Sequence, residues 1–589
     1  MTKNEIHTFH IPVMGIGYTI DSPVKVARYG ISSVVSIIED HVIERLREYY
    51  TQFIGQTYVE IKTNEVDYRA RRITSYLNIL DTIVSRQFDE IKSQSFSGDS
   101  DIVKYFEMLP DSSPLKALYV EMDALDGEDK FKLQEVLRTR MAKGCIDVNI
   151  MTKLDRVNYD AKNEAMAPEF NDAMAALRGF ANSTVEASVI FSAGMNPRLY
   201  TYCENFRDFY PSNNMRKKIV IKVSDYRSAL VQGKIFAKKG LWVSEFRIES
   251  GLNCGGHAFA TDGLLMGPIL EQFKNNRESL YVELIDIYKK ALSEKGEELN
   301  DFIPSIKISV QGGVGTNQEQ ELLLDYYNVD SVGWGSPFLL VPEATDVDQE
   351  TLSLLEHAKK EDYYLSNASP LGVPFNNVRN TSSDKQRKKR IEDGKSGSPC
   401  YLKFLSFNTE FTEKPICTAS LKYQGLKIAQ LQGSDLKEED KKSEIDRIQE
   451  LDCLCSGLGV STLLVKKEKP MYKLSAVTIC PGPNLAYFSG VFTLKEMVGH
   501  IYGRNNLLND LPRPHVFINE LNIYVDYLKN EINKCKLNFT AKQITYFNTF
   551  KNNLCLGIDY YAGLKVSLDS KLTDWLEAAK LELNNIQLA

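Results

Sequence analysis

Short apolar runs recur along the first 345 residues, and most are separated by segments with the 3.6-residue period of amphipathic helices. The runs are rich in β-branched residues, and several end at glycine or proline, which is typical of buried strands and their exit turns. Eight strand candidates can be counted, at residues 10–18, 31–38, 145–151, 187–193, 218–223, 241–248, 305–311 and 330–340.

Alternating strands and helices predict a parallel sheet. Eight such strands favour closure into a (β/α)8 barrel of the TIM type. An open, doubly wound α/β sheet is the alternative, because periodicity alone does not distinguish the two. In either arrangement the functional groups are expected on the loops that follow the strands.

Two regions depart from this alternation. Residues 39–144 keep the helical period for about a hundred residues, which is too long for one crossover and predicts a large helical insertion after strand two. Beyond residue 345 amphipathic and charged helical segments dominate. We therefore predict a barrel domain over residues 1–345 and a mostly helical C-terminal extension over residues 346–589, which could form a lid or carry a cluster.

Composition and charge narrow the class of protein. The 589 residues are 43% hydrophobic and 25% charged, as in ordinary soluble proteins, and a net charge of −7 gives no indication of nucleic-acid binding. A basic run at residues 385–390 could bind an anion or nucleic acid, but its acidic neighbours favour a solvated helix face or loop.

Targeting and redox signals are also weak. No apolar run approaches the roughly 20 residues that span a bilayer, and the first dozen residues lack the pattern of a signal peptide. Ten cysteines in so long a chain do not suggest a disulfide scaffold. We expect a cytoplasmic protein with reduced thiols, which could be oligomeric.

Glycine-rich turns accompany the last three strand candidates: Gly255, Gly256 and His257 after the sixth, Gly312 and Gly313 after the seventh, and Gly335 and Ser336 within the eighth. Backbone N–H groups exposed at glycine, with a helix starting near residue 317, suit a phosphate dianion. The alternative is that these glycines only relieve crowding at the barrel rim, and that His257 is a histidine in a turn.

Candidate catalytic side chains lie at the same strand ends. His257 could act as acid or base on a small-molecule substrate, because an unperturbed imidazole titrates near neutral pH. Lys222 could stabilise negative charge, or could simply extend its amine from the strand end into water. Arg198 and Arg247 could hold a substrate anion, although a structural ion pair is the stronger interpretation of each.

Four cysteines of the C-terminal half form a candidate metal site: Cys400, Cys417, Cys453 and Cys455. Four thiolates could hold an iron–sulfur cluster or zinc. The segments contain no CxxC pair, so buried cysteines without a metal are the simpler interpretation.

No strand candidate is followed by a convincing GxGxxG motif and a helix. The sequence therefore does not indicate a Rossmann domain.

Several short motifs follow one another in a recognisable order: Pro12-Val13-Met14-Gly15, Val148-Asn149, the GLNCGGH loop at 251–257, Gly312-Gly313-Val314, and Gly335-Ser336-Pro337-Phe338 with Glu343-Ala344. Read together, they resemble the FMN-dependent nitronate monooxygenases (2-nitropropane dioxygenases) and the related flavin-dependent enoyl-acyl-carrier-protein reductases. The resemblance covers the first 345 residues without the insertion. Asn253 and Cys254 stand where that family has Glu-Ala, and Ser250 where it has glutamine.

The resemblance implies an FMN across the barrel mouth, with its phosphate on Gly312, Gly313, Gly335 and Ser336, its ring near Met14, Gly15 and Asn149, and the Gly255-Gly256-His257 turn facing flavin and substrate. It implies an oxidoreductase that acts on a nitronate-like carbanion, an enoyl thioester or another activated carbon acid, with an electron donor or acyl carrier as a candidate partner. The alternative is a catalytically inactive barrel that binds a phosphorylated ligand or a protein.

Overall fold

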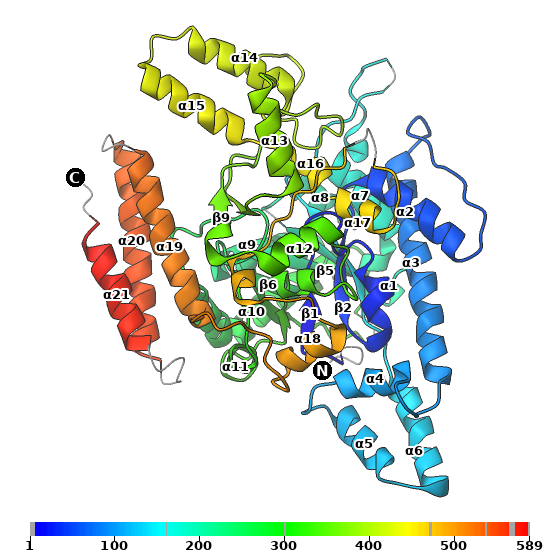
Figure 1. The fold of residues 1–589 in the computed structure, drawn as a ribbon. Coiled ribbons are helices and arrows are strands. Elements are labelled where there is room, and N and C mark those ends of the chain that lie inside the picture. The colour runs from blue at the N-terminus through cyan, green and yellow to red at the C-terminus, as the bar shows by residue number, and fades with distance from the viewer. Residues whose placement is uncertain are drawn as a thin grey trace.

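The computed structural model describes residues 6–160, 162–192, 194–299, 302–470, 474–535, 539–564 and 572–586. Eight parallel strands close into a barrel in chain order (Figure 1). They are β1 (Phe9–Ile11), β2 (Ser32–Ser36), β3 (Ile146–Met151), β4 (Ala187–Ser192), β5 (Lys217–Val223), β6 (Val243–Glu249), β7 (Lys307–Gln311) and β8 (Ser331–Gly333). The predicted (β/α)8 fold is confirmed, and the open sheet is excluded.

The first and last strands are much shorter than the apolar runs that predicted them. After β1, Pro12 lacks the N–H group that a strand ladder needs, and after β8 the chain winds into the 3-10 helix η7 (Ser336–Leu340). His10 of β1 pairs with Gly333 of β8. The segments that follow these two strands are therefore neighbouring loops at the carboxyl end of the barrel.

The helical insertion contains α2 (Asp40–Phe53), α3 (Tyr68–Ser93), α4 (Asp101–Met108), α5 (Pro114–Asp123) and α6 (Gly127–Arg140). Buried Arg69 of α3 forms ion pairs with Asp40 of α2 at 3.0 Å and with Asp172 of α7 (Asp172–Ala181) at 2.7 Å. These pairs hold α2 and α3 in the helical layer of the barrel, whereas α5 and α6 project away from it (Figure 1).

Other helices complete the layer around the barrel: α1 (Ser22–Val26) with η1 (Ala27–Tyr29), α8 (Pro197–Tyr202), α9 (Tyr226–Ala237), α10 (Met266–Glu294) and α11 (Asn317–Glu321). Each follows a strand, as a right-handed succession of βα units requires. Apolar faces of these helices pack on the outside of the strands and form one continuous core with them.

The C-terminal region is mostly helical: α12 (Gln349–His357), α13 (Ser382–Glu392), α14 (Leu421–Gln432), α15 (Glu438–Glu450), α16 (Leu454–Gly457), α17 (Val460–Val465), α18 (Leu494–Ile501), α19 (Val516–Lys534), α20 (Ala541–Ala562) and α21 (Leu572–Asn584). In Figure 1, α19 to α21 lie together on one side and α14 with α15 projects on another. The sequence pattern did not predict the antiparallel pair β9 (Tyr363–Ser366) and β10 (Phe375–Val378), whose asparagines have low strand propensity.

The interior of the barrel has an apolar layer and a polar layer. Val34, Ile190 and Val220 form the apolar layer against Val13. Nearer the amino ends of the strands, Arg247 donates to Glu245 at 2.8 Å. Arg247 is therefore a structural ion-pair residue inside the barrel, and the weaker idea that it holds a substrate anion does not fit its position.

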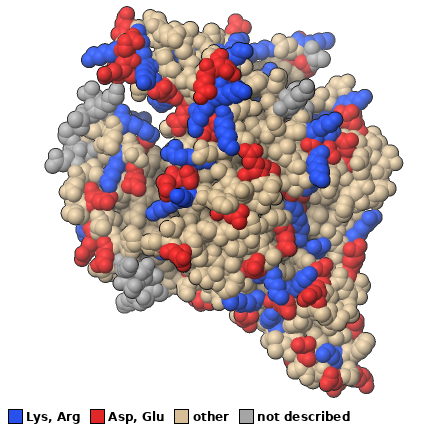
Figure 2. All heavy atoms as spheres, in the orientation of Figure 1, with Lys and Arg blue, Asp and Glu red and all other residues tan. Residues whose placement is uncertain are grey.

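Charged side chains of both signs are interspersed over the face seen in Figure 2. The basic run predicted as a solvated surface lies in α13, where Lys388 pairs with Asp384 at 2.8 Å. In the described part of the chain, no helix combines the length and the apolar character that crossing a bilayer requires.

A buried histidine makes stability depend on pH. Burial and the charge of Arg504 lower the pKa of His7 to about 4, against the hydrogen bond that its ring makes to the Tyr29 carbonyl. In the unfolded chain a histidine titrates near pH 6.5. The unfolded state therefore binds the proton first, and this contribution is complete above about pH 6.5 and is lost as the pH falls toward 4.

We expect the protein to lose about 3 kcal/mol of unfolding free energy relative to a His7→Gln variant between pH 7 and pH 4. Urea unfolding of both proteins at several pH values measures the difference. Comparing the two removes the contribution of the carboxyl groups that they share. Parallel stability curves across this range would show that His7 is not held neutral by the fold.

Candidate active site

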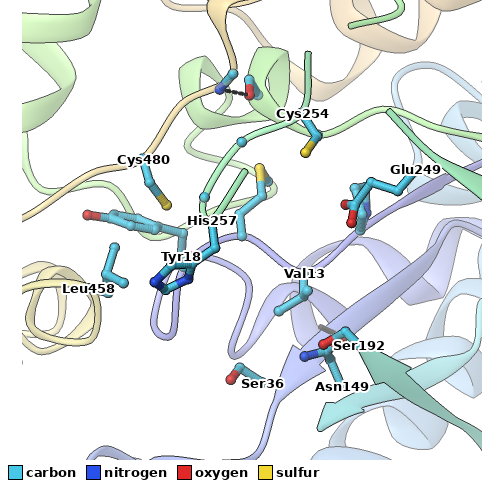
Figure 3. Close-up of a pocket in the computed structure, with 18 of the residues that line it drawn as sticks. Val13, Tyr18, Ser36, Asn149, Ser192, Glu249, Cys254, His257, Leu458 and Cys480 are labelled. Atoms are coloured by element: carbon cyan, nitrogen blue, oxygen red, sulfur yellow. Dashed lines mark hydrogen bonds between the residues drawn. The ribbon is translucent and has the colours of Figure 1, made fainter. Parts of the chain in front are cut away.

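A pocket opens at the carboxyl ends of the barrel strands (Figure 3). The structure brings to it all the residues proposed for a flavin site: Met14, Gly15, Asn149, Lys222, Gly255, Gly256, His257, Gly312, Gly313, Gly335 and Ser336. In Figure 3, Ser36, Asn149 and Ser192 line the strand side, and Cys254 and Cys480 lie across from them. The C-terminal region adds apolar walls from Phe404, Leu405, Leu458 and Ile479.

Backbone donors gather where the loops after β7 and β8 meet. Gly312 and Gly313 have φ angles of 116° and 86°, a region that favours glycine. A Cβ on Gly313 would lie 1.9 Å from the Asn253 amide nitrogen. Within the described chain, the N–H groups of Gly312, Gly313, Gly335 and Ser336 donate to no acceptor. Four donors on adjacent loops form a rim suited to an anion.

The next glycine in this loop has a structural role. The Gly315 N–H donates to the Glu319 carboxylate at 2.8 Å, and that carboxylate pairs with Arg513 at 2.6 Å. Arg513 also donates to the Gly313 carbonyl at 2.8 Å. Although burial alone would raise it, the Arg513 charge holds the pKa of Glu319 below its usual range. Arg513, which the sequence did not single out, therefore braces the glycine loop from the C-terminal region.

A polar network joins the ends of three neighbouring strands, β5, β6 and β7, next to the glycine loop that follows β7. The Lys222 ammonium lies 2.7 Å from the Glu249 carboxylate, which accepts a hydrogen bond from the Gln311 amide at 2.6 Å. Glu249 and Gln311 are paired in register on β6 and β7. Lys222 is thus held in the pocket by a counter-ion rather than directed into water. Glu249 and Gln311 could have been found from the sequence, because each is a polar residue at the end of a strand.

His257 lies in the loop after β6, which is held by the unpredicted hairpin. The Asn376 N–H donates to the Gly256 carbonyl, and the Ala258 N–H donates to the Pro374 carbonyl, both at 2.9 Å. The His257 Nε2 lies 2.7 Å from the Ser369 hydroxyl. Burial, with a smaller effect from the Lys153 charge, lowers the pKa of His257 to about 4. The imidazole is neutral near pH 7 and can accept a proton there, but it is not a source of one.

Asn149 presents an unsatisfied polar atom to the pocket. It stands near the end of β3, opposite Ser36 of β2 in the sheet register, and is 6% exposed. Its Oδ1 has no hydrogen-bond partner in the described chain. Because leaving a buried acceptor unpaired costs free energy, such an atom in a pocket indicates a ligand that donates to it.

The cysteines of the pocket are not activated. Burial raises the pKa of Cys254 well above its usual range and that of Cys480 to about 12, so both are protonated thiols near neutral pH. Cys455, one of the four proposed metal ligands, also lines the pocket. Arg198 lies outside the pocket lining, with its side chain largely exposed and 3.7 Å from Asp155.

No family model matches the chain, and no curated protein matches its sequence. A similar solved structure is the enoyl reductase domain of MlnA from the macrolactin biosynthesis cluster of Bacillus amyloliquefaciens. The two chains are 11% identical with a TM-score of 0.30, and the alignment covers 70% of this chain and 88% of that one. So distant a likeness carries no conclusion about activity, and the functional conclusion rests on the pocket itself.

Proposed function

We propose that the protein is an FMN-dependent oxidoreductase whose substrate, an activated carbon acid or an enoyl compound, binds at the barrel mouth. One observation carries the proposal: the pocket is lined by four residues whose backbone N–H groups have no acceptor in the described chain, by neutral His257 and by Asn149, whose Oδ1 is unpaired. A phosphate monoester at one end and a planar ring with N–H donors at the other would satisfy both sets of groups.

The residues present fit an FMN in two parts. Gly312, Gly313, Gly335 and Ser336 would hold the phosphate. A Cβ on Gly335 would lie 3.3 Å from Pro12 and 3.9 Å from the Met14 sulfur, so the two loops approach closely enough for one ligand to contact both. Met14, Gly15 and Asn149 would contact the ring, and the Gly255-Gly256 turn would leave room beside it.

When bound, the flavin would supply hydride transfer, and the chain would bind, orient and deprotonate the substrate. A neutral His257 can take a proton from a carbon next to a nitro or thioester group. The Lys222 ammonium, held 2.7 Å from the Glu249 carboxylate, would stabilise negative charge that develops on the substrate. Apolar residues of the C-terminal region limit water at the reacting carbon.

The substrate class follows from this set of groups. The proton acceptor is weak, so the carbon acid must already be activated, as in a nitronate-forming nitroalkane or a thioester. Oxidation of the carbon acid would need an electron acceptor, whereas reduction of an enoyl compound would need an electron donor, and an acyl carrier would be the partner for a thioester substrate. Oxidation of such a carbon acid would use His257 as the proton acceptor, whereas reduction of an enoyl compound would use the same flavin but need a proton donor, which neutral His257 is not.

Asn149 provides the test of the cofactor. We expect the protein to bind FMN, and an Asn149→Leu variant to bind it tenfold to a hundredfold more weakly, because a ligand hydrogen bond is lost at a buried site. Quenching of FMN fluorescence measures the affinity. Thermal stability should not fall, since leucine replaces an unsatisfied polar group with an apolar one of similar shape.

A suitable control is Asn275→Leu, which changes an exposed asparagine on α10. It should bind FMN like the parent protein. A protein that takes up no FMN, or whose Asn149→Leu variant keeps full affinity, would contradict the proposal. If inorganic phosphate or a phosphorylated ligand bound without flavin, the inactive ligand-binding barrel would replace it.

A further inference from the structure

Four cysteines from three separate segments converge beside the pocket. Cys400 and Cys417 close a loop that is fastened by the Leu421 N–H donating to the Ser398 carbonyl at 2.8 Å, and Cys453 and Cys455 flank the start of α16. Cys400 and Cys417 share a hydrogen bond between their thiols. The Cys455 thiol lies within electrostatic range of Cys400, Cys417 and Cys453.

The four sulfur atoms are largely buried, and each is close to a backbone N–H group. Cys400, Cys417 and Cys455 are 7%, 4% and 7% exposed, and Cys453 is half-buried. Each sulfur accepts a backbone N–H: from Lys403 at Cys400, from Ala419 at Cys417, from Ser456 at Cys453 and from Leu405 at Cys455. Neutral buried thiols need no such set of donors, whereas thiolates bound to a metal cluster are stabilised by N–H···S hydrogen bonds.

The backbone at Cys400 is also unusual. Its φ angle is 52°, and that of Lys403 is 58°, in the left-handed region that non-glycine residues rarely adopt. This geometry turns the Lys403 N–H back toward the Cys400 sulfur. Strain of this kind is typical of a segment that is shaped around a ligand.

We propose that Cys400, Cys417, Cys453 and Cys455 ligate an iron–sulfur cluster of the [4Fe–4S] type. The proposal stands on the cysteines alone and does not depend on a flavin in the barrel. It extends beyond the proposed oxidoreductase site, because it adds a second centre whose residues all come from the C-terminal region.

The four sulfurs do not form the compact set that a single metal ion needs. Four thiolates on zinc, with bonds of about 2.3 Å, lie about 3.8 Å from one another. Among the described residues, the acidic group Glu39, Asp40 and His41 is the set whose ligand atoms all lie within 4.8 Å of one another, and no three of these sulfurs do so. A cubane cluster binds each thiolate at a different iron and needs a wider set, so the hydrogen-bonded Cys400 and Cys417 thiols would separate when they bind it.

The surroundings suit a cluster in contact with the barrel mouth. Leu402 and Leu405 lie in the segment that follows Cys400, and Leu454 lies between Cys453 and Cys455. Cys455, Leu405 and Leu454 also line the pocket. An apolar shell of this kind limits water at the sulfurs. The cluster would then lie directly behind the wall of the proposed flavin pocket.

The experiment uses the full chain, produced and purified without oxygen. We expect about four iron and four acid-labile sulfide atoms per chain, with a broad brown absorption that dithionite bleaches. Cys417→Ser and Cys455→Ser should lose most of the iron and sulfide. Cys203→Ser, which changes a fully buried cysteine of the helical layer, should keep them.

A second measurement does not rely on variants that could fail to fold. In the anaerobic protein the four cysteines should resist alkylation, and they should react once a chelator and an oxidant remove the iron, as mass spectrometry would record. Stoichiometric zinc without iron, a Cys400–Cys417 disulfide, failure to take up iron and sulfide under anaerobic reconstitution, or equal iron in Cys417→Ser and Cys203→Ser would each overturn the proposal. Flavin content is read separately, so the two proposals fail independently.

Discussion

Replacing His257 with glutamine is expected to lower kcat by about 10²- to 10⁴-fold while FMN stays bound, because the variant loses the group that accepts the substrate proton. Glutamine can still hydrogen-bond to Ser369, whose hydroxyl lies 2.7 Å from the His257 Nε2. The loop geometry should therefore survive. The effect would separate the proton-transfer role of His257 from the positioning of its loop.

Anaerobic mixing with a neutral nitroalkane, followed by the loss of the flavin absorption, measures this step, and the nitroalkane anion, which has no proton to lose, should largely bypass the defect. With His257 as acceptor, activity should rise through its pKa of about 4 and stay level toward neutral pH. A catalytic acid with that pKa would give the opposite profile, with activity falling as the pH increases. His357→Gln, at the exposed end of α12, is the matched control and should behave like the parent protein.

Two results would remove His257 from the mechanism. The first is a His257→Gln variant that keeps the parent kcat. The second is a Ser369→Ala variant that loses as much kcat as His257→Gln, since that serine can only orient the ring. In the second case the loop would matter for shape, and another group would have to accept the proton.

The barrel could be predicted because its physical signal is local. A strand buried on both faces is a continuous apolar run, and the turn that ends it needs glycine or proline. The run at residues 187–193, which is largely apolar and is followed by Gly194, shows both features. Ends of strands were less predictable, since the run at 330–340 contains both β8 and the helix η7, and both are apolar because both are buried.

Site residues contributed by long-range contacts could not be predicted. Glu249 and Gln311 become partners only because β6 and β7 are neighbours in register, which the sequence does not state. The hairpin that contacts the His257 loop could not be predicted, because the asparagines of β10 have low strand propensity. For the four cysteines the sequence offered candidate ligands but no recognisable spacing, because the segments that carry them are spread over 55 residues.

The contact between Arg513 and Glu319 is the longest-range of these in the chain's site. Replacing Arg513 with alanine is expected to reduce the unfolding free energy by about 3–5 kcal/mol, because the buried Glu319 charge is left unpaired. Arg513 is 194 residues from Glu319, and both side chains are nearly fully buried, at 6% and 2% exposure. FMN binding should weaken as well, since the Gly313 carbonyl loses its donor. Urea unfolding and FMN titration measure the two effects.

The pH dependence identifies the charge as the cause. In the parent protein the lowered pKa of Glu319 contributes stability above the pKa of the unfolded chain, and this is lost as the pH falls through the folded value. Without Arg513, burial dominates and raises that pKa, so the loss of unfolding free energy in Arg513→Ala should shrink as the pH decreases.

Adding Glu319→Gln to Arg513→Ala should likewise recover part of the stability at neutral pH. Arg447→Ala, at an exposed ion pair of 3.8 Å, should cost less than about 1 kcal/mol. A deficit that is independent of pH and unchanged by Glu319→Gln would mean that Arg513 acts by packing alone, and that the glycine loop does not depend on its charge.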